Sequence, residues 1–199
     1  GSDVTVTVTG DGSQWNNSGT LYVGGWMIGP GGTARVTISD GGSVTVTETL
    51  KLFSGGTVTL DGGSLTTRSF DRSIGTFQHR DGTLTIDGGT YVRPTGTLAV
   101  DGATSTAHAS LVLSNGAVVT GVSGVTVGDT RRGSLTISGG ASITNPGLGR
   151  IGGIASSHGD ATVSGPLSAW TNSGSLTVGS QGMGELTITE GGRVANTIG

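Results

Sequence analysis

The stretch Val8-Thr9-Gly10-Asp11-Gly12-Ser13-Gln14-Trp15-Asn16-Asn17-Ser18-Gly19-Thr20-Leu21-Tyr22-Val23-Gly24 has a second copy near the other end of the chain. That copy is Val163-Ser164-Gly165-Pro166-Leu167-Ser168-Ala169-Trp170-Thr171-Asn172-Ser173-Gly174-Ser175-Leu176-Thr177-Val178-Gly179, and the two align without a gap. Self-similarity of this kind is typical of proteins built from stacked structural repeats. The rest of the chain should therefore divide into similar units.

A short motif gives the length of the unit. It consists of an apolar residue, usually a Thr, and a second apolar residue, with glycine a few positions later. Its copies are Val36-Thr37-Ile38, Val58-Thr59-Leu60, Leu84-Thr85-Ile86, Leu111-Val112-Leu113, Leu135-Thr136-Ile137, Ala161-Thr162-Val163 and Leu186-Thr187-Ile188. They lie 22, 26, 27, 24, 26 and 25 residues apart, which predicts about eight coils of about 25 residues when the strand at Val4–Val8 is included.

The order of residues within each motif predicts how a coil folds. Successive side chains of a strand point to opposite faces, so the apolar pair would face a core and the middle Thr would face solvent. Glycine at the corners supplies the positive φ angles of tight turns. No window has the 3.6-residue apolar period of a helix. We therefore predict an all-β protein, a single-stranded parallel β-helix (β-solenoid), as one domain over residues 1–199.

Composition narrows the partners. The chain has 199 residues, of which 41 are Gly and none is Cys, and only 12% are charged, with a net charge of −3. No basic stripe is present, so nucleic acid is not an expected partner. No apolar run is long enough to span a membrane, so we expect no membrane insertion by this segment. We expect neither a cofactor nor a metal.

Two regions depart from the regular pattern. Residues 66–82 are rich in Phe and Arg, and we expect an irregular coil or a lateral bulge there. The last residues, Arg193 to Gly199, resemble the start of an earlier repeat, and no polar cap of the kind that solenoids need is apparent. We therefore expect the chain to be a fragment cut artificially from a longer repeat protein.

The repeat also carries a family resemblance. The stretch Ser168 to Leu176, continued by Gly184-Glu185-Leu186-Thr187-Ile188-Thr189-Glu190-Gly191-Gly192-Arg193-Val194, resembles repeats in the passenger regions of bacterial autotransporters. The resemblance covers most of the chain and is loosest between about Leu50 and Val100. It implies a right-handed β-helix located on the bacterial cell surface or outside the cell, often with an adhesive role.

Carboxylates offer an enzymatic alternative. Asp40, Asp61 and Asp87 each precede Gly-Gly and could stack at one corner, where they would bind Ca²⁺ or cleave a polysaccharide. A glycosidase needs two carboxyl groups about 5–9.5 Å apart. We favour a role in turns, because Asp hydrogen-bonds its own backbone there. His79, His108 and His158 occupy different phases of the repeat, which argues against a metal site.

Aromatic and basic residues provide the candidate binding site. Trp15 and Trp170 share one repeat position and are expected to pack in the core or at a corner. Tyr22 replaces an outward Thr of the second copy and Trp26 lies in an insertion, so both should be exposed and could form a contact patch. Arg68 and Arg72 could bind an acidic glycan, as could Arg131-Arg132.

The outward Thr residues allow a third interpretation. Thr37, Thr59, Thr85, Thr136, Thr162 and Thr187 would form a ladder, and flat Thr arrays on solenoids can bind ice. Thr is also simply favoured on exposed strands. We predict a non-enzymatic adhesive rod that self-associates or binds a surface glycan. A polysaccharide-cleaving enzyme and an ice-binding solenoid remain the alternatives.

Overall fold

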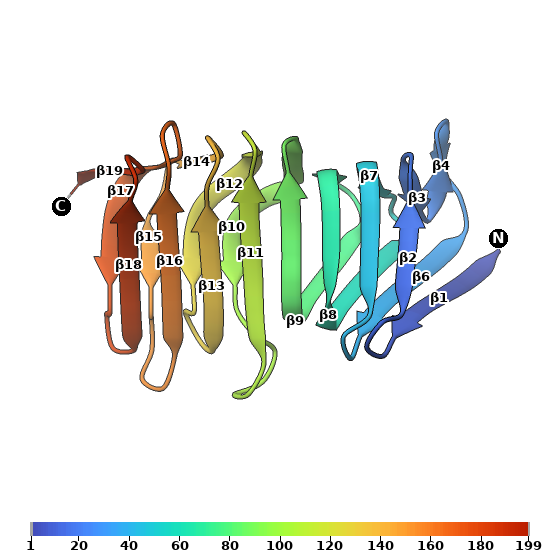
Figure 1. Ribbon diagram of the computed structural model, residues 1–199, viewed down its shortest axis with the longest axis horizontal. Coiled ribbons are helices and arrows are strands. Elements are labelled where there is room, and N and C mark those ends of the chain that lie inside the picture. Colours follow the sequence, from blue (N-terminus) through green and yellow to red (C-terminus); the bar gives the residue numbers. More distant parts are fainter. Residues whose placement is uncertain (1, 199) are drawn as a thin grey trace.

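The computed structural model describes residues 2–198, and these residues form strands joined by turns and loops. Seventeen strands belong to one sheet, and β4 (Gly25–Trp26) and β5 (Gly29–Pro30) form a separate antiparallel hairpin. The sheet winds into a solenoid of about seven turns, with the two ends of the chain at opposite ends of the rod (Figure 1). This confirms the predicted all-β parallel β-helix. Gly1 and Gly199, which the predicted domain includes, lie outside the described residues.

Each turn of the solenoid has three sides, and strands on one side stack as a parallel column. Column 1 contains β1 (Asp3–Thr9), β6 (Thr33–Ser39), the starts of β8 (Gly56–Asp71) and β9 (Thr76–Asp87), the ends of β10 (Thr90–Val100) and β12 (Val118–Val127), β15 (Gly149–Ile151) and the end of β17 (Ala169–Val178).

Column 2 contains β2 (Gln14–Asn17), the start of β7 (Ser43–Leu52), the middle of β8, the end of β9, β11 (His108–Ser114), β13 (Arg132–Ile137), β16 (His158–Ser164) and β18 (Met183–Thr189). Column 3 contains β3 (Leu21–Val23), the ends of β7 and β8, the starts of β10 and β12, β14 (Ser142–Asn145), the start of β17 and β19 (Arg193–Ile198).

The core follows the predicted alternation. In column 2, Leu84, Leu111 and Leu135 are register partners on successive levels, and each is at most 1% exposed. The residue two positions further along each strand is also buried, and the side chain between them faces outward. No helix in the described residues is available to span a membrane.

The repeat motif changes column partway along the rod. Val58 pairs with Phe77 in column 1, and the hydrogen-bonded pair beside them, Thr59 and Gln78, is separated by only 19 residues. The next motif, at Leu84, therefore stacks on Leu65 in column 2 instead of continuing column 1. The expected single ladder of motifs is thus wrong, because this coil is too short to carry the motif round to the same side. The short coil overlaps residues 66–82 and is compact, with no lateral bulge.

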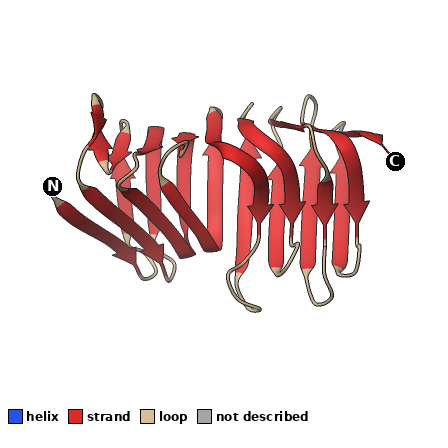
Figure 2. Ribbon diagram, turned by 180° about the vertical axis from the view of Figure 1, so that it is seen from behind, coloured by secondary structure: helices blue, strands red, loops and turns tan. Residues whose placement is uncertain are grey.

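Column 1 is interrupted where the short coil ends. Residues 76–79 have no register pairing with the strand at 96–100, whereas columns 2 and 3 continue past this level. Figure 2 shows the result from behind, with slanted strands in the N-terminal half and steeper strands in the C-terminal half. A cavity of about 40 Å³ lies at the interruption, lined by Phe77, His79, Tyr91 and Arg93 among others. Phe70 packs there, stacked on Tyr91 at 5.4 Å between ring centroids.

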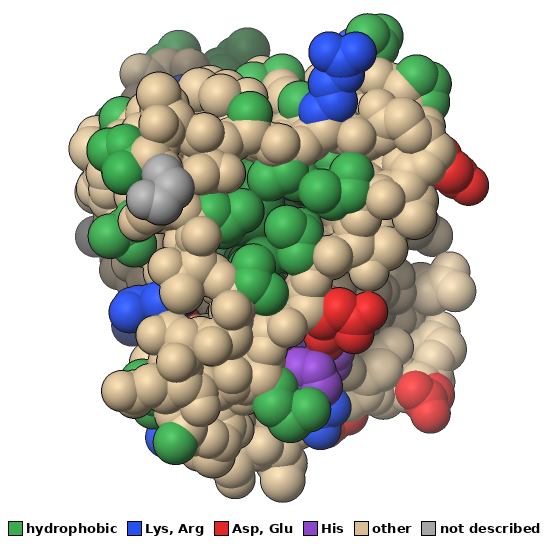
Figure 3. Space-filling view, turned by 90° about the vertical axis from the view of Figure 1, so that its left-hand side faces the viewer, with side chains coloured by type: hydrophobic (Ala, Val, Ile, Leu, Met, Phe, Trp, Pro, Cys, Tyr) green, Lys and Arg blue, Asp and Glu red, His purple; other side chains and the backbone are tan. Residues whose placement is uncertain are grey.

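The C-terminal end of the rod exposes residues that face inward in the other coils. Val178 and Ile188 are register partners of the buried Ile151 and Val163, yet they are 43% and 47% exposed. Ile198 is 60% exposed. Figure 3 shows apolar side chains gathered at the centre of this end, surrounded by polar atoms. No further level covers them within residues 2–198.

Candidate binding surfaces

The outer side of column 2 carries two long rows of hydroxyl-bearing side chains, which we name the hydroxyl face. Its side chains alternate with the buried apolar residues of the same strands. The first row consists of Ser43, Ser64, Thr83, Ser110 and Ser134, and the second row consists of Thr45, Thr66, Thr85, Val112, Thr136, Thr162 and Thr187. Neighbouring levels of a parallel sheet lie about 4.8 Å apart, so each row is an evenly spaced line.

The hydroxyl face is flat because its strands pair in uniform register. Within the strands of column 2, no β-bulge interrupts the pairing from β7 to β18. Val112 breaks the second row once, and Asp160 and Glu185 continue the first row as carboxylates. The expected Thr ladder is corrected here, since Thr37 and Thr59 belong to column 1. Thr45 and Thr66 take their places, and the resulting ladder is more continuous than the one expected.

The structure brings the predicted aromatic pair together at the N-terminal end of column 3. The ring centroids of Tyr22 and Trp26 are 6.0 Å apart, and Trp26 stands on the β4–β5 hairpin, which projects beyond the sheet. Trp26 is 62% exposed, and the adjoining Met27 and Ile28 are 67% and 92% exposed. Tyr22 is less exposed than expected, because its ring also packs on Phe53 at 6.1 Å.

The two arginines of the predicted site do not join this patch or each other. Arg68 is exposed and lines a shallow groove with Thr45, Thr47 and Asp87 at the corner between columns 2 and 3. Arg72 lies at the corner between columns 3 and 1, where its guanidinium donates to the Phe77 carbonyl at 3.2 Å and sits 5.7 Å from the Phe77 ring centroid. Arg72 therefore packs within the fold, and only Arg68 is placed to meet a ligand.

The two Trp residues of the repeated stretch confirm the packing interpretation. Trp170 is fully buried, and its indole N–H donates to Asn145 Oδ1 at 3.0 Å. Trp15 is half-buried against the core. Trp15 belongs to column 2 and Trp170 to column 3, so identical sequence positions occupy different sides of the solenoid. Neither indole is available as a carbohydrate-stacking platform of the kind an exposed ring provides.

The predicted stack of three carboxylates does not form. Asp40 and Asp61 lie near the corner between columns 1 and 2, whereas Asp87 lies at the next corner, where it accepts hydrogen bonds from Ser114 and Asn115 at 2.7 and 2.6 Å. Asp40 has a left-handed φ of 49° and accepts from Thr9 at 3.0 Å. These contacts are those of turn residues. Within residues 2–198 no cluster of three or more His, Asp or Glu is arranged to hold a metal.

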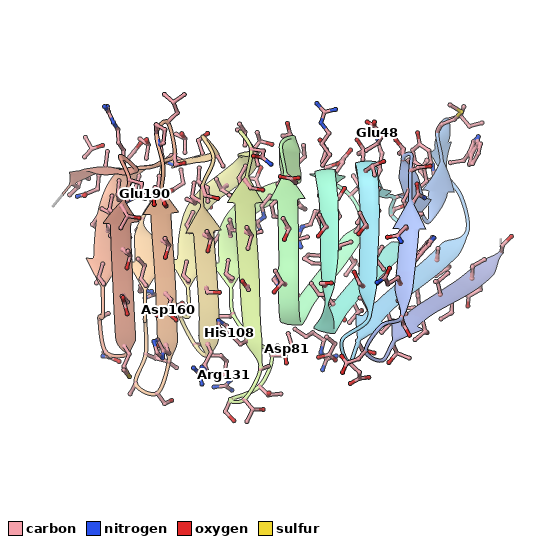
Figure 4. The ribbon with its side chains drawn as sticks, viewed as in Figure 1. Glu48, Asp81, His108, Arg131, Asp160 and Glu190 are labelled. Carbon is pink, nitrogen blue, oxygen red and sulfur yellow. The ribbon has the colours of Figure 1, made fainter. Side chains whose placement is uncertain are left out.

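The corner that leads into column 2 is the most highly charged part of the rod. Figure 4 shows Asp81, His108, Arg131 and Asp160 along this edge, and Glu48 and Glu190 on the opposite edge. Asp129 and Arg150 form an ion pair at 2.6 Å, and His158 Nε2 lies 3.0 Å from Asp160 Oδ1. Burial raises the pKa of Asp101 above its usual value, even though the backbone N–H groups of Thr130 and Arg131 donate to its carboxylate.

A groove lies along this edge. It has a volume of about 450 Å³ and is lined by Ser105, Arg132, Ser156, Ser157, His158, Gln181, Gly182 and Met183. The sequence analysis considered Arg131-Arg132 for an acidic glycan but did not place it in a groove. The lengths of the connecting loops were the available signal, because long loops precede β11 and β16 and a short one precedes β13.

Comparisons with protein-family models, with curated proteins and with solved structures find no match for this chain.

Proposed function

We propose that the protein is an adhesive rod of a bacterial surface or secreted protein, of the autotransporter passenger type, and that it associates with other copies through the hydroxyl face. The observation that carries the proposal is the regular, flat arrangement of Ser and Thr on seven successive levels of column 2. Such a face can meet a second copy without steric obstruction, and each hydroxyl both donates and accepts hydrogen bonds.

The strength of this association would come from repetition. A single intermolecular hydrogen bond contributes only about 1 kcal/mol net. Two flat faces aligned along the rod would form many such bonds, and contacts beyond the first become effectively intramolecular. The low charge of the chain, with 12% charged residues and a net charge of −3, keeps long-range repulsion between copies small.

We expect charges placed on the hydroxyl face to abolish association. The double variant Thr85→Glu/Thr136→Glu introduces two carboxylates into the second row, at positions that point away from the core. Loss of two contacts of about 1 kcal/mol each corresponds to a roughly 30-fold weaker association. The measurement is the settling rate of bacteria that display the segment, together with sedimentation of the purified chain.

The matched control is Thr120→Glu/Thr144→Glu. Thr120 and Thr144 are exposed on β12 and β14, outside the hydroxyl face, and this variant has the same net charge as the test variant. We expect the control to settle like the parent segment. Equal effects of both variants would refute the assignment of this face, and an absence of settling by the parent segment would refute self-association.

The same two rows favour ice binding as a second candidate function. The evenly spaced hydroxyl groups on a flat sheet could match a regular solid surface, whereas Val112, Asp160 and Glu185 interrupt them. Thermal hysteresis of the purified chain tests this candidate directly, and a value of zero excludes it.

Polysaccharide cleavage has weaker support. Asp160 and Glu185 are register partners on adjacent levels, which brings two carboxylates near each other. Asp160 is engaged by His158 at 3.0 Å and Glu185 accepts from Thr187 at 3.4 Å. The groove nearby contains no aromatic ring besides His158 to position a sugar. We therefore place the activity of this protein in binding.

A further inference from the structure

We propose that the groove at the corner before column 2 binds an anionic sugar unit of a surface polysaccharide, with Arg132 as the group that recognises the acid. The inference extends the proposed adhesive function to attachment to a glycan, and it does not depend on association through the hydroxyl face. It uses a separate surface, formed by loops instead of strands.

The groove results from alternating loop lengths. Residues 101–107 and 152–157 form long connections into β11 and β16, while residues 128–131 form a short connection into β13 between them. Figure 1 shows the two long connections projecting further from the rod than the short one. Arg132 begins β13 and is the register partner of His158, so it lies in the depression between the longer loops.

The loops around the groove are held by internal hydrogen bonds. Asp101 accepts from the backbone N–H groups of Thr130 and Arg131 at 3.2 and 3.3 Å, which anchors the short connection. Ser157 donates to the Ile154 carbonyl at 2.8 Å, and the Ala107 N–H donates to Thr104 Oγ1 at 3.2 Å. A groove whose walls are already ordered loses less conformational entropy when a ligand binds.

The charges of the groove favour an anion at one point. Within residues 2–198, every other basic group near the groove has an assigned partner: Arg150 pairs with Asp129, His158 with Asp160, and Arg131 donates to the Thr130 carbonyl. Arg132 is exposed and forms no ion pair in that part of the chain. Its planar guanidinium can bind a carboxylate or a sulfate through two parallel hydrogen bonds.

The remaining lining suits the rest of a sugar. Ser105, Ser156 and Gln181 are able to hydrogen-bond hydroxyl groups, and Met183 offers an apolar surface for the face of a ring. Asp160 is the carboxylate closest to the lining residues, and its contact with His158 offsets part of its repulsion of an anion. The groove therefore combines one unpaired cation with neutral polar groups, which is the chemistry that a uronic acid or a sulfated sugar requires.

The experiment measures binding of the purified chain to immobilised polygalacturonate, dextran sulfate and neutral dextran. Because the chain has a net charge of −3, general attraction to a polyanion is unfavourable and retention requires a local site. We expect binding to at least one acidic polymer and none to dextran. Binding to polygalacturonate identifies a carboxylate ligand, and binding to dextran sulfate alone identifies a sulfated one.

Variants then locate the site. We expect Arg132→Gln to weaken binding about tenfold, and Arg132→Lys to restore only part of it, because Lys keeps the charge without the planar fork. Arg35→Gln is the matched control, since Arg35 is exposed on β6 and far along the chain from the groove. Equal losses in Arg132→Gln and Arg35→Gln would overturn the inference, as would failure of the parent chain to bind either acidic polymer. Neither outcome affects the settling result, which tests self-association separately.

Discussion

Replacement of Trp170 by Ala is expected to destabilise the solenoid by about 3–5 kcal/mol, the range for removing a large aromatic side chain from a core. The indole is fully buried in column 3, between the register partners Ile143 and Val194. Its removal opens a cavity that the surrounding backbone pairing prevents from closing. The measurement is the free energy of unfolding in urea, followed by circular dichroism.

A second contribution arises from the polar groups that Trp170 satisfies. Its N–H donates to Asn145 Oδ1, the Asn145 amide donates to Asn172 Oδ1, and Asn172 Nδ2 donates to the Gly174 carbonyl at 2.7 Å. Both Asn side chains are fully buried. A buried acceptor left without its donor costs about 1–3 kcal/mol. Trp170→Phe, which keeps most of the apolar volume, should therefore still lose about that amount.

Trp15→Ala is the matched control for Trp170→Ala. The two residues occupy the same position of the repeated sequence, but Trp15 is only half-buried. We expect the loss in Trp15→Ala to be less than about 2 kcal/mol, because less apolar surface is exposed to water by the change. Equal losses at the two positions would contradict the burial difference on which the prediction rests.

Replacement of Gly128 by Ala should cause the second large effect, a loss of about 2–5 kcal/mol. Gly128 has a φ of +55°, which costs a residue with a Cβ about 1–2 kcal/mol. A Cβ at this position would also lie 2.1 Å from the His158 carbonyl oxygen of the next level. Relief of that contact requires the coils to separate, and overpacking of this kind costs about 1–3 kcal/mol.

Gly116→Ala separates the two causes. Gly116 also has a positive φ, of +79°, but a Cβ there would have nothing within 4 Å. We expect Gly116→Ala to lose only the conformational part, about 1–2 kcal/mol. Thermal unfolding of both variants provides the comparison, and a Gly128→Ala protein as stable as Gly116→Ala would show that the coils can yield at that corner.

Much of the fold could be predicted from local sequence because its causes are local. The apolar–Thr–apolar motif directs two side chains inward and one outward wherever it occurs, and glycine permits the corner that follows. Leu84, Leu111 and Leu135 therefore face the core as expected. The burial of Trp170 and the adjacency of Tyr22 and Trp26 also followed from the repeat, since the insertion at Trp26 returns the chain to the same corner.

The candidate sites depend on which strands stack, and this was not local. Arg68 and Arg72 are close in sequence but lie at different corners, because the end of β8 runs along column 3 between them. Arg132 gained its groove from loops in two other coils. Thr45 and Thr66 joined the Thr ladder only because their strands share column 2 with Thr85.

By itself, the sequence determined that this chain is an all-β solenoid, which side chains face its core, and where its corners lie. Only the tertiary structure decided the column of each strand. The physical reason is the 19-residue spacing between Thr59 and Gln78, against 25 residues between Leu113 and Ser138 later in the rod. A coil shortened by one strand advances the later motifs by one side of the solenoid. The alternation of side chains is unchanged by this shift, but the partners on the surface are all new.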